Sequence, residues 1–213
     1  MKRRFFLFAA IGLPFAAHSQ PAAALAGLQI LIKILGEAGQ ALADFSKGIK
    51  DATRNGLEVI SLVSVERELK RIRKISKGLA IVIESRQVPI VSSIDEYLRL
   101  ARKSPKPSES VMQEQWQGLE IKMRQVLAEV QALIQEVEAE NGDLIFEGTY
   151  SNLTRSLQHR SQALRVFASI PVPVKSEELE ALEIANDAYK QLLKNAREAL
   201  NDLNKYAKSK SKS

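Results

Sequence analysis

The chain has 213 residues, of which 45% are hydrophobic, and it contains only 10 glycines and 7 prolines. A chain of this length and composition can bury one sizeable core, so we expect a single domain. Cysteine is absent, which excludes disulfides, thiolate metal sites and lipid attachment through a processed N-terminal cysteine. Stability must therefore come from packing.

The first residues, "MKRRFFLFAAIGLPFAAHSQ", predict a cleavable export signal over residues 1–19. Three basic residues precede a run of thirteen apolar residues, and Ala17 and Ser19 are small residues before a cleavage point. A bilayer span needs roughly 20 apolar residues, so we do not expect this run to remain as an anchor. These features favour a periplasmic or secreted bacterial protein.

Residues 3–7 read Arg-Arg-Phe-Phe-Leu, which resembles the bacterial twin-arginine signal, an address read by a receptor. The leader departs from the fuller pattern at Lys2, where Ser or Thr is usual, and at Phe8, where Lys is usual. The resemblance implies that the protein folds in the cytoplasm before export. An ordinary basic leader that happens to contain two arginines is the alternative.

The remaining sequence predicts an all-α fold, with an antiparallel bundle of about five long amphipathic helices plus one short one over residues 20–204. The prolines lie in the leader or between periodic stretches, as is typical of a helical chain. In the clearest stretch, apolar residues alternate spacings of four and three over nearly four heptads. These residues are Met112, Trp116, Leu119, Met123, Val126, Val130, Leu133 and Val137.

Three other segments show the same periodicity less regularly. Capping patterns predict where some helices begin: Ser110 with Gln113, Ser93 with Glu96 at the start of the short helix, and Ser176 before the last helix. The inward positions are Leu62, Val65, Leu69, Ile72, Leu79 and Ile83, then Tyr150, Leu153, Leu157, Leu164 and Phe167, and finally Leu179, Leu182, Tyr189, Leu192, Ala196, Leu200 and Leu203.

Two short stretches, "GLAIVIES" and "QVPIVSS", are rich in β-branched residues and leave a strand open as an alternative. We predict a helix for the first of them.

The segment over residues 25–50 confines its polar side chains to a strip about 80° wide on a helix. Its four glycines each cost on the order of 1 kcal/mol relative to alanine, so this helix must be buried, either in its own bundle or in a membrane or partner. Lys33 and Glu37 interrupt the apolar run and argue against a permanent span. The face to be buried contains Leu28, Leu31, Ile34, Leu35, Leu42 and Phe45.

A basic stripe is predicted at outer heptad positions of the second helix: Arg67, Lys70, Arg71, Lys74 and Lys77. A solvated face is one interpretation, and binding of an anionic lipid head group or an acidic protein partner is another. Nucleic acid is not expected, because the chain is predicted to be exported and no aromatic residues are interleaved with the cations. Acidic residues such as Glu129 and Glu136 can neutralise the stripe within the fold or between copies, which leaves a homo-oligomer open.

The sequence offers no recognisable chemical site. After the leader, His159 is the single histidine, and no phosphate-binding loop or nucleophile elbow is present. We therefore expect no cofactor, no metal and no catalytic residue, and we expect residues 205–213 to form a disordered, lysine-rich tail.

These observations predict an exported, non-enzymatic helical-bundle protein that acts as a binding or scaffolding module in the bacterial envelope. The alternative is a membrane-active protein whose first helix enters or lies on a bilayer. An enzyme that uses only carboxylates and lysines is a third hypothesis.

The export prediction is tested by N-terminal sequencing of the secreted protein, which should begin near Gln20. Finding Met1 intact would contradict the cleavage. Changing Arg3 and Arg4 together to lysine should block export if the twin-arginine route is used, and unchanged export would exclude that route.

Overall fold

A computed structural model of the chain describes residues 21–54, 62–139 and 147–210. Within these ranges the protein is built from five helical rods, which confirms the predicted all-α bundle of long helices. The predicted leader lies outside the described residues. The rods are α1 (Pro21–Arg54), a second rod made of α2 (Leu62–Ala80), η1 (Ile81–Gln87) and α3 (Val88–Ala101), α4 (Glu109–Ala139), α5 (Glu147–Phe167) and α6 (Ser176–Lys210).

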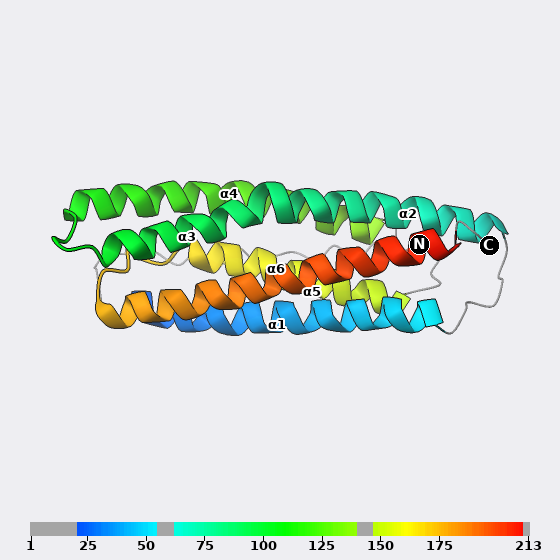
Figure 1. Cartoon of the computed structure of the whole chain (residues 1–213), viewed down its shortest axis with the longest axis horizontal. Coiled ribbons are helices and arrows are strands. Elements are labelled where there is room, and N and C mark those ends of the chain that lie inside the picture. Colours follow the sequence, from blue (N-terminus) through cyan, green and yellow to red (C-terminus); the bar gives the residue numbers. More distant parts are fainter. Residues whose placement is uncertain (1–20, 55–61, 140–146, 211–213) are drawn as a thin grey trace, which may run out of the picture.

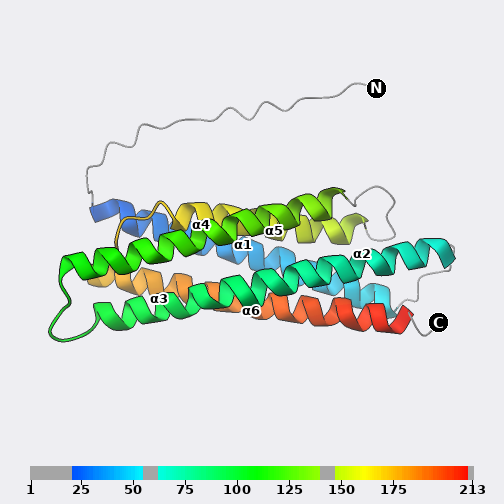
Figure 2. The ribbon, with the colours of Figure 1, turned by 90° about the horizontal axis from the view of Figure 1, so that it is seen from above.

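The five rods run up and down along one long axis and close into a ring around a single core (Figure 1, Figure 2). α1 packs on α5 and α6, α5 packs on α4, and the second rod packs between α4 and α6. A ring with an odd number of alternating rods must contain one parallel pair. That pair is α1 and α6. Ser46 bonds to Asp202, and Asn195 bonds to Gly39, so both contacts join residues 156 positions apart. Residue numbers that rise together along two neighbouring helices show that the helices are parallel.

The apolar seam predicted on α4 is confirmed, since all eight of its side chains are buried. Trp116 lies near one end of this seam, where its ring stacks on Phe167 and meets the edge of Tyr97. The indole Nε1 donates a hydrogen bond to the carbonyl oxygen of Ile170 at 3.0 Å. The seam therefore joins α4 to α3 and α5. The predicted inward residues of α5 are also buried.

The predicted start of the short helix at Ser93 is wrong, because α3 begins at Val88. Ser93 lies inside α3, where its hydroxyl donates to the carbonyl oxygen of Pro89 at 2.8 Å instead of capping a helix. The second rod continues from α2 through the π-helical segment η1 into α3, so both β-branched stretches are helical. The wider π-helical turns end just before Pro89, the second residue of α3. Proline has no amide hydrogen, so it cannot donate a backbone hydrogen bond to the preceding turn.

The start of α4 differs from the predicted capping box by two residues. The helix begins at Glu109, and the carbonyl oxygen of Ser108 accepts the amide hydrogen of Met112 at 3.2 Å. Ser110 therefore lies in the first turn of the helix and does not cap it.

The start of α6 is capped by a carboxylate and not by the predicted serine. Ser176 is the first helical residue, and Glu178 Oε2 accepts the backbone amides of Val174 and Lys175 at 3.0 Å each. Glu178 is buried and stands three positions after Lys175, as in the acidic half of a capping box. Its negative charge also suits the positive end of the helix.

The lysine-rich tail is shorter than predicted. α6 extends to Lys210, and Tyr206 is buried, so the first six residues of the predicted tail are helical. Burial of the Tyr206 ring against the core favours continuation of the helix.

All four tyrosines of the chain, Tyr97, Tyr150, Tyr189 and Tyr206, are buried. Burial raises the pKa of each phenol above its ordinary value, to about 12 for Tyr206. The negative charge of Glu68 adds to the rise in pKa at Tyr150 and Tyr206. The folded chain thus holds four protons more tightly than the unfolded chain.

We predict an alkaline unfolding transition that coincides with tyrosine ionisation. Unfolded tyrosines titrate near pH 10, so the free energy of unfolding contributed by these groups is fully present below pH 10 and falls as the pH rises through the folded-state pKa values. Tyrosinate absorbance should therefore appear together with loss of the helical circular dichroism signal, at a pH above the titration seen in denaturant. Tyrosinate formation near pH 10 with the helical signal intact would contradict the buried positions.

Candidate functional site

The predicted basic stripe is only partly on the surface. Arg67, Lys70, Lys74 and Lys77 are exposed, but the prediction for Arg71 is wrong, because this side chain is buried. Glu68 and Arg71 are three residues apart, so both lie on the face of α2 that points into the bundle. Arg71 Nη1 is 3.5 Å from Glu68 Oε2, and its guanidinium lies 4.6 Å from the centre of the Tyr150 ring.

The packing of α6 on α2 brings further cations to this surface. Arg197 donates two hydrogen bonds to the carboxylate of Glu84 on η1, at 2.7 and 2.9 Å, and these fix the antiparallel register of α6 on the second rod. Lys208 lies 11 residues after Arg197, and Arg73 lies 11 residues before Glu84. Because α-helices rise 1.5 Å per residue and only the last few of these residues lie in η1, Lys208 and Arg73 lie at about the same level along the bundle.

We call this region the basic surface, and Figure 2 shows the end of α6 beside α2 where it lies. Sequence reasoning missed Arg73 because it falls outside the heptad stripe, and it assigned Lys205 and Lys208 to a disordered tail. The register of α2 and α6 brings these residues together. The members of the basic surface, all exposed, are Lys70, Arg73, Lys77, Lys205 and Lys208.

The apolar face predicted on the first helix lies inside the bundle. Leu28, Leu31, Ile34, Leu35, Leu42 and Phe45 are each no more than 4% exposed, packed in the core between α5 and α6. By length and composition, Ala23–Asp51 is apolar enough to cross a membrane. A core helix of a bundle and a signal sequence near the N-terminus pass the same test, and 44% of the most apolar window is buried inside the bundle.

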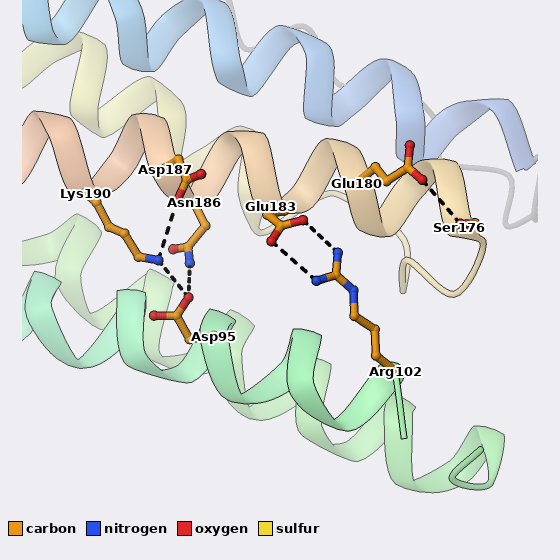
Figure 3. A network of polar contacts seen from close by, with 8 residues as sticks. All are labelled: Asp95, Arg102, Ser176, Glu180, Glu183, Asn186, Asp187 and Lys190. Atoms are coloured by element: carbon orange, nitrogen blue, oxygen red, sulfur yellow. Dashed lines mark hydrogen bonds and ion pairs between the residues drawn. The ribbon is translucent and has the colours of Figure 1, made fainter. Parts of the chain in front are cut away.

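A seam of polar contacts joins α3 to α6 (Figure 3). Asp95 Oδ1 accepts hydrogen bonds from Asn186 Nδ2 at 2.7 Å and from Lys190 Nζ at 2.9 Å. Further along, Arg102 Nη2 donates to Glu183 Oε2 at 2.7 Å, which lowers the pKa of the Glu183 carboxyl. The charged groups are exposed, so each pair contributes little stability. Their effect is to set the register of α3 on α6.

Two acidic residues expected to neutralise the stripe lie on α4 and pair with the second rod. Glu136 Oε1 is 3.6 Å from Lys74 Nζ, and Glu129 Oε1 is 2.7 Å from Arg86 Nε. His159 Nδ1 on α5 lies 3.5 Å from Glu37 Oε2 on α1. Within the described ranges, no three His, Cys, Asp or Glu side chains are grouped to hold a metal ion.

A polar recess lies between α4 and α5, with a volume of about 840 Å³. Its walls carry four glutamines, together with Arg165 and the partly buried Ile134. The lining amides can donate and accept hydrogen bonds, and Glu138 and Ser161 add a carboxylate and a hydroxyl to the same walls. The glutamines are Gln131, Gln135, Gln158 and Gln162.

A second polar feature lies at the centre of the ring, where Arg160 on α5 reaches Gln87 on η1. These two elements are not neighbours in the ring, so the contact crosses its interior. Arg160 Nη1 donates to Gln87 Oε1 at 3.2 Å, and both side chains are at most 1% exposed. Burial lowers the pKa of Arg160 to about 10, so the guanidinium keeps its charge at neutral pH. Periodicity did not single out either residue.

Comparison with known proteins finds no matching family model, no matching curated protein and no matching solved structure.

The position of the α1 face is tested by a pair of adjacent substitutions. Leu31 is buried and Ile30 is 52% exposed, so Leu31→Asp buries an unpaired carboxylate whereas Ile30→Asp adds a solvated one. We expect Leu31→Asp to lower the free energy of unfolding by roughly 3 kcal/mol or more and Ile30→Asp by less than about 1 kcal/mol. Denaturant unfolding followed by circular dichroism measures both. An unaltered melt of Leu31→Asp together with lost lipid binding would favour the membrane hypothesis.

Proposed function

We propose that this chain is an exported, non-enzymatic helical bundle that acts as a binding module in the bacterial envelope, and that it docks peripherally on anionic lipid head groups through the basic surface. The observations that carry the proposal are the row of exposed cations on α2 and the packing of α2 on α6, whose last turns add two exposed lysines. Lys70, Arg73 and Lys77 make no ion pair with any residue in the described part of the chain. Their charges are therefore available to an external partner.

The expected affinity is modest. Each lysine or arginine near an anionic membrane contributes about 1 kcal/mol. Lys208 takes part in another interaction, so the other four cations of the basic surface contribute about 4 kcal/mol. This energy corresponds to a dissociation constant on the order of 1 mM. Binding of this kind weakens as salt screens the charges.

Insertion of α1 into the bilayer is the second candidate, supported by the apolar length of that helix. It requires the buried face of α1 to leave the bundle. The bilayer would bury this face again, but the core faces of α5 and α6 that now cover it would be exposed to water. Exposing each buried leucine, isoleucine or phenylalanine costs roughly 1.5 to 3 kcal/mol. Peripheral docking needs no such rearrangement.

The docking proposal is tested with two triple variants of the mature protein that remove the same charge. Lys70→Gln/Arg73→Gln/Lys77→Gln removes part of the basic surface, and Arg99→Gln/Lys103→Gln/Lys106→Gln removes exposed cations from the other end of the second rod and the loop after it. Co-sedimentation with phosphatidylglycerol vesicles should weaken about a hundredfold for the first variant and less than threefold for the second. Phosphatidylcholine vesicles should bind neither the parent protein nor the variants.

Equal losses in the two variants, or no binding of the parent protein to anionic vesicles, would refute the proposal.

Insertion of α1 is tested separately by joining Gly39→Cys to Asn195→Cys with a short bifunctional thiol reagent. Asn195 Nδ2 lies 3.4 Å from the Gly39 carbonyl oxygen, and the natural chain has no cysteine to interfere. Peripheral docking predicts unchanged vesicle binding after crosslinking, whereas α1 insertion predicts its loss.

A further inference from the structure

The core of the ring contains two buried arginines whose surroundings differ. Arg71 has Glu68 as a carboxylate partner and Tyr150 under its guanidinium. Arg160 is more deeply buried, at 1% exposure, and pairs with no carboxylate in the described part of the chain. A buried charge without a counter-charge costs several kcal/mol. The charge of Arg160 therefore lacks the balance that Arg71 has.

Several buried hydrogen-bond donors at and around Arg160 have no acceptor. Its Nη1 is used by Gln87, but Nε and Nη2 make no hydrogen bond to the protein. These two nitrogens form the edge of the guanidinium that binds a carboxylate through paired hydrogen bonds. Gln87 Nε2 and the Tyr189 hydroxyl are likewise buried and without a partner. Three rods, α5, the second rod and α6, thus each supply an unused donor.

Tyr189 is buried in the core on α6, and its phenol interacts electrostatically with the Arg160 guanidinium. Burial raises the pKa of the Tyr189 phenol, and the charge of Arg160 partly offsets this rise. The phenol is therefore neutral at neutral pH. It can donate a hydrogen bond, but it supplies no negative charge to Arg160.

The π-helical segment η1 brings Gln87 to this place. Val82 and Ile83 are buried, and continued α-helical spacing from Leu79 would place Arg86 inward next. Instead, the amide of Val88 bonds to the carbonyl oxygen of Ile83 with the wider π spacing, Arg86 is exposed, and Gln87 is buried. The rod thus presents a neutral amide to Arg160 and avoids a second buried cation. π-Helical turns are rare and occur frequently at functional sites.

We propose that Arg160, Gln87 and Tyr189 form an internal binding site for a small monoanion, in which the Nε–Nη2 edge of Arg160 holds a carboxylate group. The Tyr189 hydroxyl and the Gln87 amide donate to the same anion. Water would satisfy the donors but would leave the charge of Arg160 unbalanced, whereas a monoanion satisfies both. The site is independent of the basic surface, so either proposal can fail without the other.

Formate is the probe, because it is the smallest carboxylate. Thermal melts of the mature protein are recorded at constant ionic strength while formate replaces a bulky sulfonate anion. We expect a saturable rise in Tm with formate, as for any ligand that binds only the folded state. Arg160→Met should fold and lose the formate-dependent rise. Arg165→Met, an exposed site on the same helix, should retain it.

Tyr189→Phe removes one donor while keeping the ring, and it should raise the half-saturating formate concentration by about tenfold or more, as expected for a hydrogen bond to a charged group. If Arg160→Met does not fold, carbon-13 NMR of labelled formate with the parent protein and Tyr189→Phe decides the question. Equal Tm values in formate and sulfonate would indicate an arginine solvated by water and would overturn the proposal. A formate effect that survives in Arg160→Met would also overturn it.

Discussion

α1 has apolar side chains around most of its circumference, so a single neighbouring helix cannot bury it. The structure satisfies this requirement by placing α1 between α5 and α6, and the buried face extends from Leu28 to Phe45. The chain returns to α1 twice, with α5 after two intervening rods and with α6 after three, and α6 therefore lies parallel to α1. Closure of the five-rod ring follows from this need, and the interior that it creates holds the other buried residues.

Polar groups within that interior are arranged in separate layers. Near one end, Glu68 balances Arg71 and bonds to the Tyr150 hydroxyl at 2.7 Å. At the centre, Arg160 bonds only to the neutral Gln87. An unpaired buried charge is costly, whereas a paired one is close to neutral in its effect on stability. The contrast between two arginines in one core is the reason to regard the central layer as a binding site.

The same helix register that orders the core also shapes the surface. Arg197 with Glu84, and Lys190 with Asp95, hold α6 antiparallel to the second rod at successive levels. These exposed pairs contribute little to stability individually, but they determine which side chains lie level across the seam. The cations of the basic surface come together at the far end of that seam. The proposed docking surface is thus a consequence of pairing between helices more than 100 residues apart in places.

Local periodicity by itself determined the helical class, the apolar seam of α4 and the buried face of α1, because each of these depends on the spacing of apolar residues within one helix. Tertiary structure decided the features that depend on contacts between helices. Ser93 lies in the middle of α3 because the helical rod before it continues without a break. Arg71 is buried because its guanidinium contacts Glu68 and the ring of Tyr150. Lys208 joined the basic surface through the register of α6 on α2. Nothing in the spacing of residues along α5 distinguishes Arg160. Its charge is buried at the centre because the five rods close into a ring, and the periodicity of one helix carries no information about residues that pack against it from other helices.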